Sequence, residues 1–331
     1  MNRLNSIRDM VSNTPLLEID ITYMNKPLKI YAKAEYYNLT GSIKDRVAYY
    51  ILKKAIDSGE LKDDDIIAEA TSGNTGIAFC AAGTYLGHKV VIYMPDWMSR
   101  ERINLMESFG AEVRLVSKEE GGFLGSIKMT EELAKKGGVF LPCQFSNEEN
   151  VNAHIDDTSV EIAKQLKELG LVAGGVVAGV GTGGTIMGLA RGLRKFNPQL
   201  KAYPLEPANS PTLSTGYKVG SHRIQGISDE FIPPIVKLDE LDEVVAVDDI
   251  DSIIMAKRLS RELGIGVGIS SGANFLGAVK KAAEIPDGTV MVTVFADDNK
   301  KYLSTDYSND WEAKDEYISS KIELNGYRAI R

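Results

Sequence analysis

Short apolar runs alternate along this chain with longer amphipathic stretches, and this alternation restricts the fold more than any other feature. Strand-like runs are expected at 66–70, 89–94, 112–116, 174–180, 201–205 and 289–295. Between them, apolar residues recur at helical spacing, as in 47–58, 76–86, 99–109 and 250–263. Several of these stretches end at a glycine, as helices commonly do: Gly59, Gly87, Gly110 and Gly264. The pattern predicts an α/β fold with mostly parallel sheets.

Length and composition restrict the class of protein further. At 331 residues the chain exceeds what one hydrophobic core usually organises, so we expect two domains. A net charge of -8 argues against nucleic acid or an anionic membrane surface as the main partner and favours a small molecule. Cys80 and Cys143 lack CxxC spacing and are expected to be buried small side chains in a reducing compartment. With no signal peptide or membrane span evident, we expect a cytoplasmic protein.

Two glycine-rich loops follow strand-like runs and open helix-like runs. The first is T-S-G-N-T-G at 71–76, and the second is G-V-G-T-G-G-T at 179–185. Backbone N–H groups exposed at the start of a helix bind anions, so each loop is a candidate anion site. The alternative is that these glycines only allow tight turns.

The second loop also fits a dinucleotide-binding protein. Gly179, Gly181 and Gly184 satisfy GxGxxG after a strand, and Glu206 ends the next strand, where an acid would bind a ribose. This hypothesis explains neither the first loop nor the lysine described next. It remains an alternative, as does a catalytically silent binding protein.

Lys44 lies in a turn of small residues, L-T-G-S-I-K-D-R at 39–46, just before a helix-like stretch. Together with the S-G-N-T-G and G-T-G-G-T loops and Y-L-S-T at 302–305, it resembles the cysteine synthase family of fold-type II pyridoxal-phosphate enzymes, which includes cystathionine β-synthase. The resemblance extends from Asn13 to Thr305. Further matching segments are 94–102, 144–145, 224–227, 231–233 and 268–273.

The resemblance implies an architecture like that of the tryptophan synthase β-subunit, with two domains that are each a mostly parallel twisted sheet flanked by helices. Residues 1–40 and 150–331, with a C-terminal extension from Asp306, are expected to form the larger domain, which binds the cofactor phosphate. Residues 41–149 are expected to form a smaller, mobile domain that closes over the substrate, with 118–125 and 216–228 as mobile rims. A homodimer is also implied.

The same resemblance implies a role for each matching residue. Lys44 would form a Schiff base with pyridoxal 5'-phosphate and later take the α-proton of the substrate. Asn74 would bind the ring hydroxyl of the cofactor. The cofactor phosphate would be bound by Gly181, Thr182, Gly183, Gly184 and Thr185. The substrate carboxylate would be bound by Thr71, Ser72, Asn74, Thr75 and Gln144. No metal site is expected.

Two segments depart from the family pattern. Where many relatives place a serine against the ring nitrogen, this chain has Asp297 and Asp298, and a carboxylate there would favour a protonated nitrogen. The alternative is that both aspartates face solvent or cap a turn. After Ile227 the chain has Asp229 and Glu230, whereas cysteine synthases usually have small residues there.

An acid after Ile227 bears on the choice of nucleophile. In a closed site, Asp229 or Glu230 would repel a hydrosulfide anion and instead bind an ammonium group or deprotonate water or a thiol; alternatively, the two form a solvated pair on a loop. We therefore expect β-replacement through an aminoacrylate intermediate, with cysteine consumed, hydrogen sulfide released, and lanthionine or serine formed. Biosynthetic O-acetylserine sulfhydrylase activity is the alternative.

Overall fold

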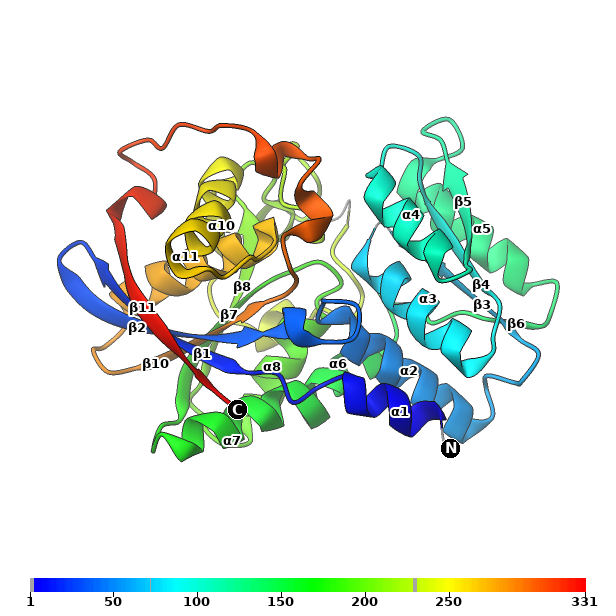
Figure 1. Ribbon diagram of the computed structural model, residues 1–331, viewed down its shortest axis with the longest axis horizontal. Coiled ribbons are helices and arrows are strands. Elements are labelled where there is room, and N and C mark those ends of the chain that lie inside the picture. The colour runs from blue at the N-terminus through cyan, green and yellow to red at the C-terminus, as the bar shows by residue number, and fades with distance from the viewer. Residues whose placement is uncertain (1–2, 72, 229–230) are drawn as a thin grey trace. The chain divides into compact units, whose positions relative to one another are not determined.

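The structure is a computed structural model that describes residues 3–71, 73–228 and 231–331. The chain divides into two compact units, drawn in Figure 1. Unit 1 consists of the described residues up to Ser12 together with Asn38–Ala153, and unit 2 of Asn13–Tyr37 together with His154–Arg331.

Unit 1 is built on a parallel sheet of four strands in the order β5-β4-β3-β6. These strands are β3 (Ile66–Ala70), β4 (Val90–Pro95), β5 (Glu112–Val116) and β6 (Val139–Phe140). The helices of the unit are α1 (Arg3–Met10), α2 (Lys44–Ser58), α3 (Asn74–Leu86), α4 (Arg100–Ser108), α5 (Gly122–Ala134) and α6 (Glu149–Ala153).

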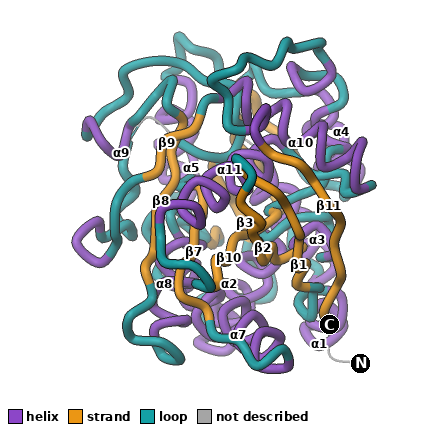
Figure 2. Tube along the Cα trace, turned by 90° about the vertical axis from the view of Figure 1, so that its left-hand side faces the viewer, coloured by secondary structure: helices purple, strands orange, loops and turns teal. Residues whose placement is uncertain are grey.

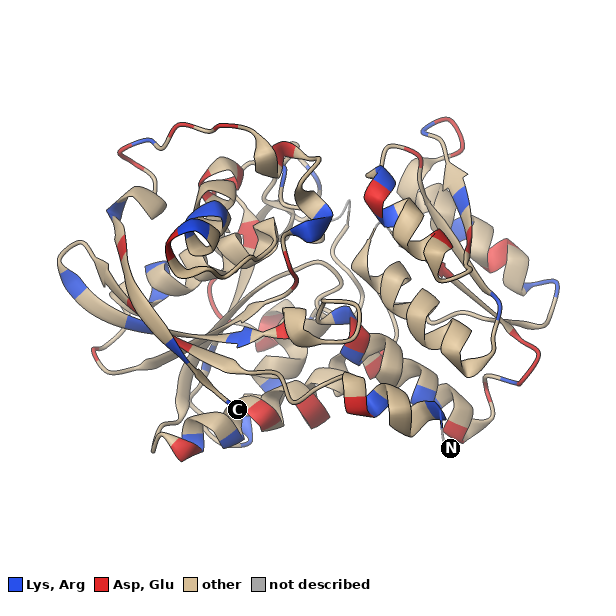
Figure 3. Ribbon diagram, in the orientation of Figure 1, with Lys and Arg blue, Asp and Glu red and all other residues tan. Residues whose placement is uncertain are grey.

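The burial of α3 explains how this unit is packed. Its sequence, N-T-G-I-A-F-C-A-A-G-T-Y-L, carries no charged residue, so the helix is tan throughout in Figure 3. A helix that is apolar on all faces is stable only when it is covered. It packs against α2 and α4, and its side chains join the core that α2 and β4 also build.

Unit 2 contains a sheet of seven strands in the order β11-β1-β2-β10-β7-β8-β9, with β11 and β9 at its edges (Figure 2). From β2 to β9 neighbouring strands are parallel, whereas β1 is antiparallel to both β2 and β11. Their bounds are β1 (Leu16–Tyr23), β2 (Lys26–Ala34), β7 (Ala173–Gly179), β8 (Lys201–Pro207), β9 (Val245–Val247), β10 (Val290–Phe295) and β11 (Ile322–Ile330).

Helices accompany the parallel strands of unit 2, and α11 is buried along most of its length because it packs against β10, β7, β2 and α10. The α-helices are α7 (Ser159–Glu168), α8 (Gly184–Arg194), α9 (Thr212–Thr215), α10 (Asp249–Leu263) and α11 (Ile269–Glu284). A π-helical turn, η2 (His154–Thr158), precedes α7. The 3-10 turns are η1 (Glu35–Tyr37), η3 (Leu238–Glu240), η4 (Lys300–Tyr302), η5 (Asp306–Ser308) and η6 (Ser319–Lys321).

The predicted α/β class is confirmed, and each of the six expected strands is present within two residues of its expected bounds. Gly59, Gly87 and Gly264 end their helices in the left-handed conformation, which glycine adopts at little cost. The last strand of the C-terminal extension, β11, pairs with β1 of the same chain. In the part of the chain that the structure describes, no helix is long and apolar enough to cross a membrane.

Two details differ from the sequence-based expectations. Residues 1–40 were assigned to one domain, but α1 packs on α2 and α3 in unit 1, because Ile7 and Val11 are buried in its core. Cys80 is buried as expected, whereas Cys143 is exposed on a turn, and both are free thiols. The division into a phosphate-binding domain and a mobile substrate domain remains a prediction.

Candidate functional site

Lys44 is the first residue of α2, and the turn before it is well defined. Its side chain is half-buried, and its backbone N–H donates to Ser42 Oγ at 3.3 Å. Asp45 secures the turn by accepting hydrogen bonds from the Thr40 N–H at 2.8 Å and the Thr40 hydroxyl at 2.7 Å. Lys44 therefore lies at the start of a helix whose first turn is bound to the preceding segment through Asp45 and Thr40.

The starts of α2 and α3 lie at the same edge of the sheet in unit 1. Helix α3 directly follows β3, so it begins at the carboxyl end of the strands. Helix α2 has 15 residues, which corresponds to about 22 Å, and a short connection joins its end to the beginning of β3. The start of α2 is therefore at the carboxyl edge too, where open α/β sheets bind their ligands.

The loop between β3 and α3 presents the predicted carboxylate-binding residues. Thr71 and Thr75 are buried, and the Thr71 hydroxyl accepts a hydrogen bond from the Gly73 N–H at 3.3 Å. The first bond within α3 runs from the Ile77 N–H to the Gly73 carbonyl at 3.2 Å, so the N–H groups of Asn74, Thr75 and Gly76 precede it. Such a helix start attracts anions. Ser72 lies outside the described residues.

Gln144 belongs to the same cluster although it is distant in sequence. It is 3% exposed, and its Nε2 donates to the Ala70 carbonyl at the end of β3 at 3.0 Å. Its own N–H donates to the carboxyl group of Glu69 at 3.3 Å. The structure thus brings Gln144 to the loop that contains Thr71 and Thr75, as a shared carboxylate site requires.

In unit 2, the loop after β7 forms a narrow cradle at the start of α8. A Cβ at Gly181 would lie 2.2 Å from the Gly226 carbonyl oxygen, and Gly183 has a φ of +89° with Val236 Cγ2 2.2 Å from the position of a Cβ. Only glycine fits either position. The first bond within α8 is donated by the Met187 N–H to the Gly183 carbonyl, so three backbone N–H groups open the helix before it.

The two threonines of this loop are buried and ordered. Thr182 Oγ1 accepts a hydrogen bond from the Gly184 N–H at 3.4 Å. Thr185 Oγ1 lies 3.4 Å from His154 Nε2, and the other ring nitrogen of His154 lies 2.9 Å from Thr158 Oγ1. Small residues, helical N–H groups and hydroxyls together match the needs of a phosphate group, so this loop fits the phosphate of pyridoxal phosphate.

The two candidate aspartates near the end of β10 differ in their surroundings. Asp297 is fully buried, and its Oδ2 accepts a hydrogen bond from the Tyr302 hydroxyl at 2.6 Å. Asp298 instead caps a turn, because it accepts from the Lys300 N–H at 3.1 Å and lies 3.5 Å from the Lys300 ammonium. The turn-capping alternative therefore describes Asp298, and Asp297 is the candidate that remains for the ring nitrogen.

Glu206, the acid considered for a dinucleotide, has a structural partner. It is 1% exposed and accepts hydrogen bonds from the backbone N–H groups of Leu213 at 2.7 Å and Ser214 at 3.3 Å. The Ser214 hydroxyl donates to it as well. Its carboxylate therefore holds the start of α9, and the GxGxxG match lacks the ribose-binding acid that it needs.

Two polar residues received no role from sequence. Glu69 was hidden inside an apolar strand-like run. Ser271 lies in the first turn of α11, its hydroxyl is buried, and among the described residues that hydroxyl has no hydrogen-bond partner. Gly268, just before α11, donates its N–H to the Asp297 carbonyl at 3.0 Å, so this serine-bearing turn begins beside Asp297. For Ser271, the one indication in the sequence was that G-I-S-S-G at 268–272 matches the family pattern.

The predicted acids Asp229 and Glu230 lie outside the described residues. The preceding segment packs on the glycine-rich loop after β7, because the Ser228 N–H donates to the Val180 carbonyl at 2.7 Å and the Gly226 carbonyl faces Gly181. Ser228 has a φ of +55°, which is uncommon for a residue with a side chain. This part of the expected 216–228 rim is thus tied to the loop.

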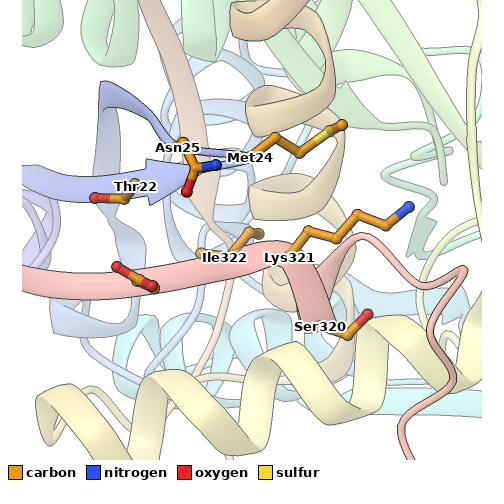
Figure 4. Close-up of a pocket in the computed structure, with 7 residues that line it drawn as sticks. Thr22, Met24, Asn25, Ser320, Lys321 and Ile322 are labelled. Atoms are coloured by element: carbon orange, nitrogen blue, oxygen red, sulfur yellow. The ribbon is translucent and has the colours of Figure 1, made fainter.

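A separate pocket in unit 2 contains none of the predicted site residues. Figure 4 shows that it lies at the turn between β1 and β2 and the start of β11. Its lining is Thr22, Met24, Asn25, Ser320, Lys321, Ile322 and Glu323. Among the residues that the structure describes, no group of three or more His, Cys, Asp or Glu side chains gathers as metal ligands do.

Comparison with known proteins gives a consistent result. The family model "Pyridoxal-phosphate dependent enzyme" matches residues 7–297. A probable cysteine synthase of Bacillus subtilis is 41% identical over 299 residues, which cover 90% of this chain and 96% of that protein. A hydrogen sulfide-producing enzyme of Fusobacterium nucleatum has a crystal structure that matches with a TM-score of 0.95 and 53% identity, covering 99% of both chains. An aspartate-to-asparagine variant of that enzyme, crystallised with an α-aminoacrylate intermediate, matches with a TM-score of 0.95 and 54% identity over 98% of both chains.

Proposed function

Because the chain belongs to the cysteine synthase family of pyridoxal-phosphate dependent enzymes, we propose that it consumes cysteine and releases hydrogen sulfide. The observation that carries this proposal is the 53% identity, over 99% of both chains, to the hydrogen sulfide-producing enzyme. That identity exceeds the 41% shared with the probable cysteine synthase. O-Acetylserine sulfhydrylase activity is the second candidate, supported by the relatives named cysteine synthase.

The proposed reaction has two halves. In the first, cysteine loses its α-proton and its β-thiol, which leaves as hydrogen sulfide. In the second, the thiol of another cysteine or a water molecule adds to the β-carbon, and the α-carbon regains a proton. The net reaction converts two cysteines into lanthionine and hydrogen sulfide, or cysteine and water into serine and hydrogen sulfide.

Residues of this chain are proposed to divide the work between binding and proton transfer. When bound, pyridoxal phosphate withdraws electrons from the α-carbon of the substrate, which makes both its α-proton and its β-substituent easier to remove. The Lys44 amine is proposed to carry the cofactor and then to take the α-proton. Loop 181–185 is proposed to bind the phosphate, and Asn74 the ring hydroxyl. Thr71, Ser72, Thr75 and Gln144 are proposed to bind the substrate carboxylate.

Products formed from cysteine alone test the proposed reaction. We expect hydrogen sulfide together with lanthionine or serine, because cysteine supplies both the leaving group and one of the two nucleophiles. Mass spectrometry of the amino acids and a sulfide assay measure this, with the same enzyme given O-acetylserine and sulfide for comparison. Cysteine formation from O-acetylserine without any sulfide release from cysteine would instead establish the second candidate.

Asp229 and Glu230 are proposed to act on the second substrate. A carboxylate in a closed site attracts an incoming ammonium group and accepts a proton from a thiol or water. Asp229→Asn and Glu230→Gln are each expected to slow the second half-reaction by about 100-fold while changing the first by much less. Stopped-flow absorbance separates the two halves, and an equal loss in both would contradict this role.

The protein is also proposed to be a homodimer, as the family resemblance implies, and to reside in the cytoplasm, as its two free cysteines favour. Light scattering of the purified protein measures the oligomeric state. A strictly monomeric enzyme with full activity would remove this part without affecting the proposed reaction.

A further inference from the structure

Glu69 is a buried carboxyl group to which the proposed chemistry assigns no role. It lies at the end of β3, two residues before Thr71, and is only 5% exposed. Its Oε2 accepts a hydrogen bond from the Gln144 N–H at 3.3 Å, and its Oε1 accepts one from the Ala70 N–H at 2.9 Å. The Cys143 N–H also donates to it. A buried carboxyl group persists only where such donors compensate for lost water.

These bonds replace part of the strand pairing of the sheet. Strand β6 pairs with β3 only at Ile66 and Ile67. Farther along β3, the Glu69 carboxyl group receives the backbone N–H of Gln144, and the Gln144 side chain donates to the Ala70 carbonyl at 3.0 Å. Two side chains thus hold the chain after β6 against the carboxyl end of β3.

The segment held in this way is a strained turn. Cys143 has a φ of +52°, a conformation that costs an L-residue with a side chain about 1–2 kcal/mol. Its carbonyl accepts hydrogen bonds from the N–H groups of Ser146 at 3.0 Å and Asn147 at 2.9 Å. Asn150 Nδ2 donates to the Gln144 carbonyl at 2.8 Å. Donors and acceptors on both sides of Gln144 are therefore used to maintain one backbone geometry.

We propose that Glu69 is a positioning residue for the substrate carboxylate: it holds the Cys143–Gln144 turn so that the Gln144 amide is presented beside the start of α3. Because Gln144 Nε2 donates one hydrogen to the Ala70 carbonyl, the orientation of the amide is defined. An amide nitrogen carries two hydrogens, and among the described residues the second has no acceptor, so we propose that it serves an anion. The inference rests on the proposed function to the extent that Gln144 binds the substrate.

The protonation of Glu69 agrees with this role. Burial raises the pKa of Glu69 to about 8, against the opposing effect of the N–H donors of Gln144, Ala70 and Cys143. At neutral pH the group is therefore mostly uncharged. An uncharged carboxyl group can hold the turn without repelling an anion bound at the nearby helix start.

The test is a double-variant cycle with Glu69→Gln and Gln144→Ala. Each variant is expected to raise KM about tenfold for both L-cysteine and O-acetyl-L-serine, with kcat nearly unchanged. In each, the Gln144 amide no longer donates to the charged substrate carboxylate, which is a loss of about one hydrogen bond to a charged group. The double variant is expected to be no worse than Gln144→Ala alone, because Glu69 acts through Gln144. The amino-acid concentration that half-saturates the absorbance change of the bound cofactor should rise by the same factor.

Controls separate positioning from general destabilisation. Glu18→Gln removes a buried carboxylate that accepts from Lys29 at 2.7 Å and Arg328 at 2.6 Å, and it is expected to lower Tm without altering KM. If Glu69→Gln folds poorly, Glu69→Asp, which keeps the carboxyl group, completes the cycle. Multiplicative effects in the double variant, or a fall in kcat at constant KM, would overturn the inference. If the enzyme turns over only O-acetylserine, the proposal that it consumes cysteine fails. The inference about Glu69 is then tested by the KM values of the same variants for O-acetylserine alone.

Discussion

Lys44→Ala is expected to lower the turnover of cysteine by about 1,000-fold or more, because the variant loses both the amine that carries the cofactor and the base that takes the α-proton. The fold should be retained. Lys44 is the first residue of α2, and the hydrogen bonds of Asp45 to Thr40 that secure this turn do not involve its side chain. Steady-state sulfide release and thermal unfolding measure the two expectations.

The matched control for this variant is Lys53→Ala on the same helix. Lys53 is partly exposed and pairs with Asp57 one turn later, an arrangement that contributes little to stability. Full activity is expected for it. Lys44→Ala enzyme that still releases sulfide at a rate close to that of the parent would show that another group performs the chemistry.

Gly181→Ala is expected to weaken binding of pyridoxal phosphate by about 10- to 100-fold, which corresponds to the cost of overpacking a close contact. The added Cβ would lie 2.2 Å from the Gly226 carbonyl oxygen, and both partners are backbone, so the loop has to shift. A shifted loop no longer aims its N–H groups at one phosphate position. Titration of the apoenzyme with the cofactor, followed by absorbance, measures the dissociation constant.

Gly277→Ala provides the comparison for this effect. Its Cβ would lie 2.4 Å from Leu205 Cδ1, so it also overpacks the core of unit 2, but on α11 and not in the loop. It should lower Tm while leaving the affinity for the cofactor unchanged. If both variants weakened cofactor binding equally, a general loss of stability would explain both results. The proposal that loop 181–185 binds the phosphate would then lose its support.

The parallel strands and their helices could be predicted because their signals are local. Buried parallel strands appear in the sequence as short apolar runs. The ends of α2 and α10 could be located because each helix stops at a glycine in the left-handed conformation, Gly59 and Gly264. Both glycine-rich loops could also be located, because each follows a strand and opens a helix; that they bind anions remains a prediction. Lys44 had no such local signal, and only its resemblance to a family made it a candidate.

What sequence did not indicate depends on contacts between distant residues. Strand β11 pairs with β1 across almost the whole length of the chain, and only Ile322 of its nine residues is buried, so it lacks the continuous apolar run of the core strands. The position of Glu206 at the end of a strand suggested a ribose-binding acid. In the structure its carboxylate accepts hydrogen bonds from the N–H groups of Leu213 and Ser214 at the start of α9, which are not its immediate neighbours in sequence. Glu69 and Gln144 lie 75 residues apart, so their pairing was not visible in either segment.

Chemical trapping of the imine identifies the lysine that carries the cofactor. The purified enzyme, loaded with pyridoxal phosphate, is reduced with borohydride so that the imine becomes a stable amine, then digested and analysed by mass spectrometry. We predict a single modified peptide with the pyridoxyl phosphate group on Lys44. Modification of a different lysine, or no modified peptide from enzyme that is active and yellow before reduction, would show that Lys44 does not carry the cofactor.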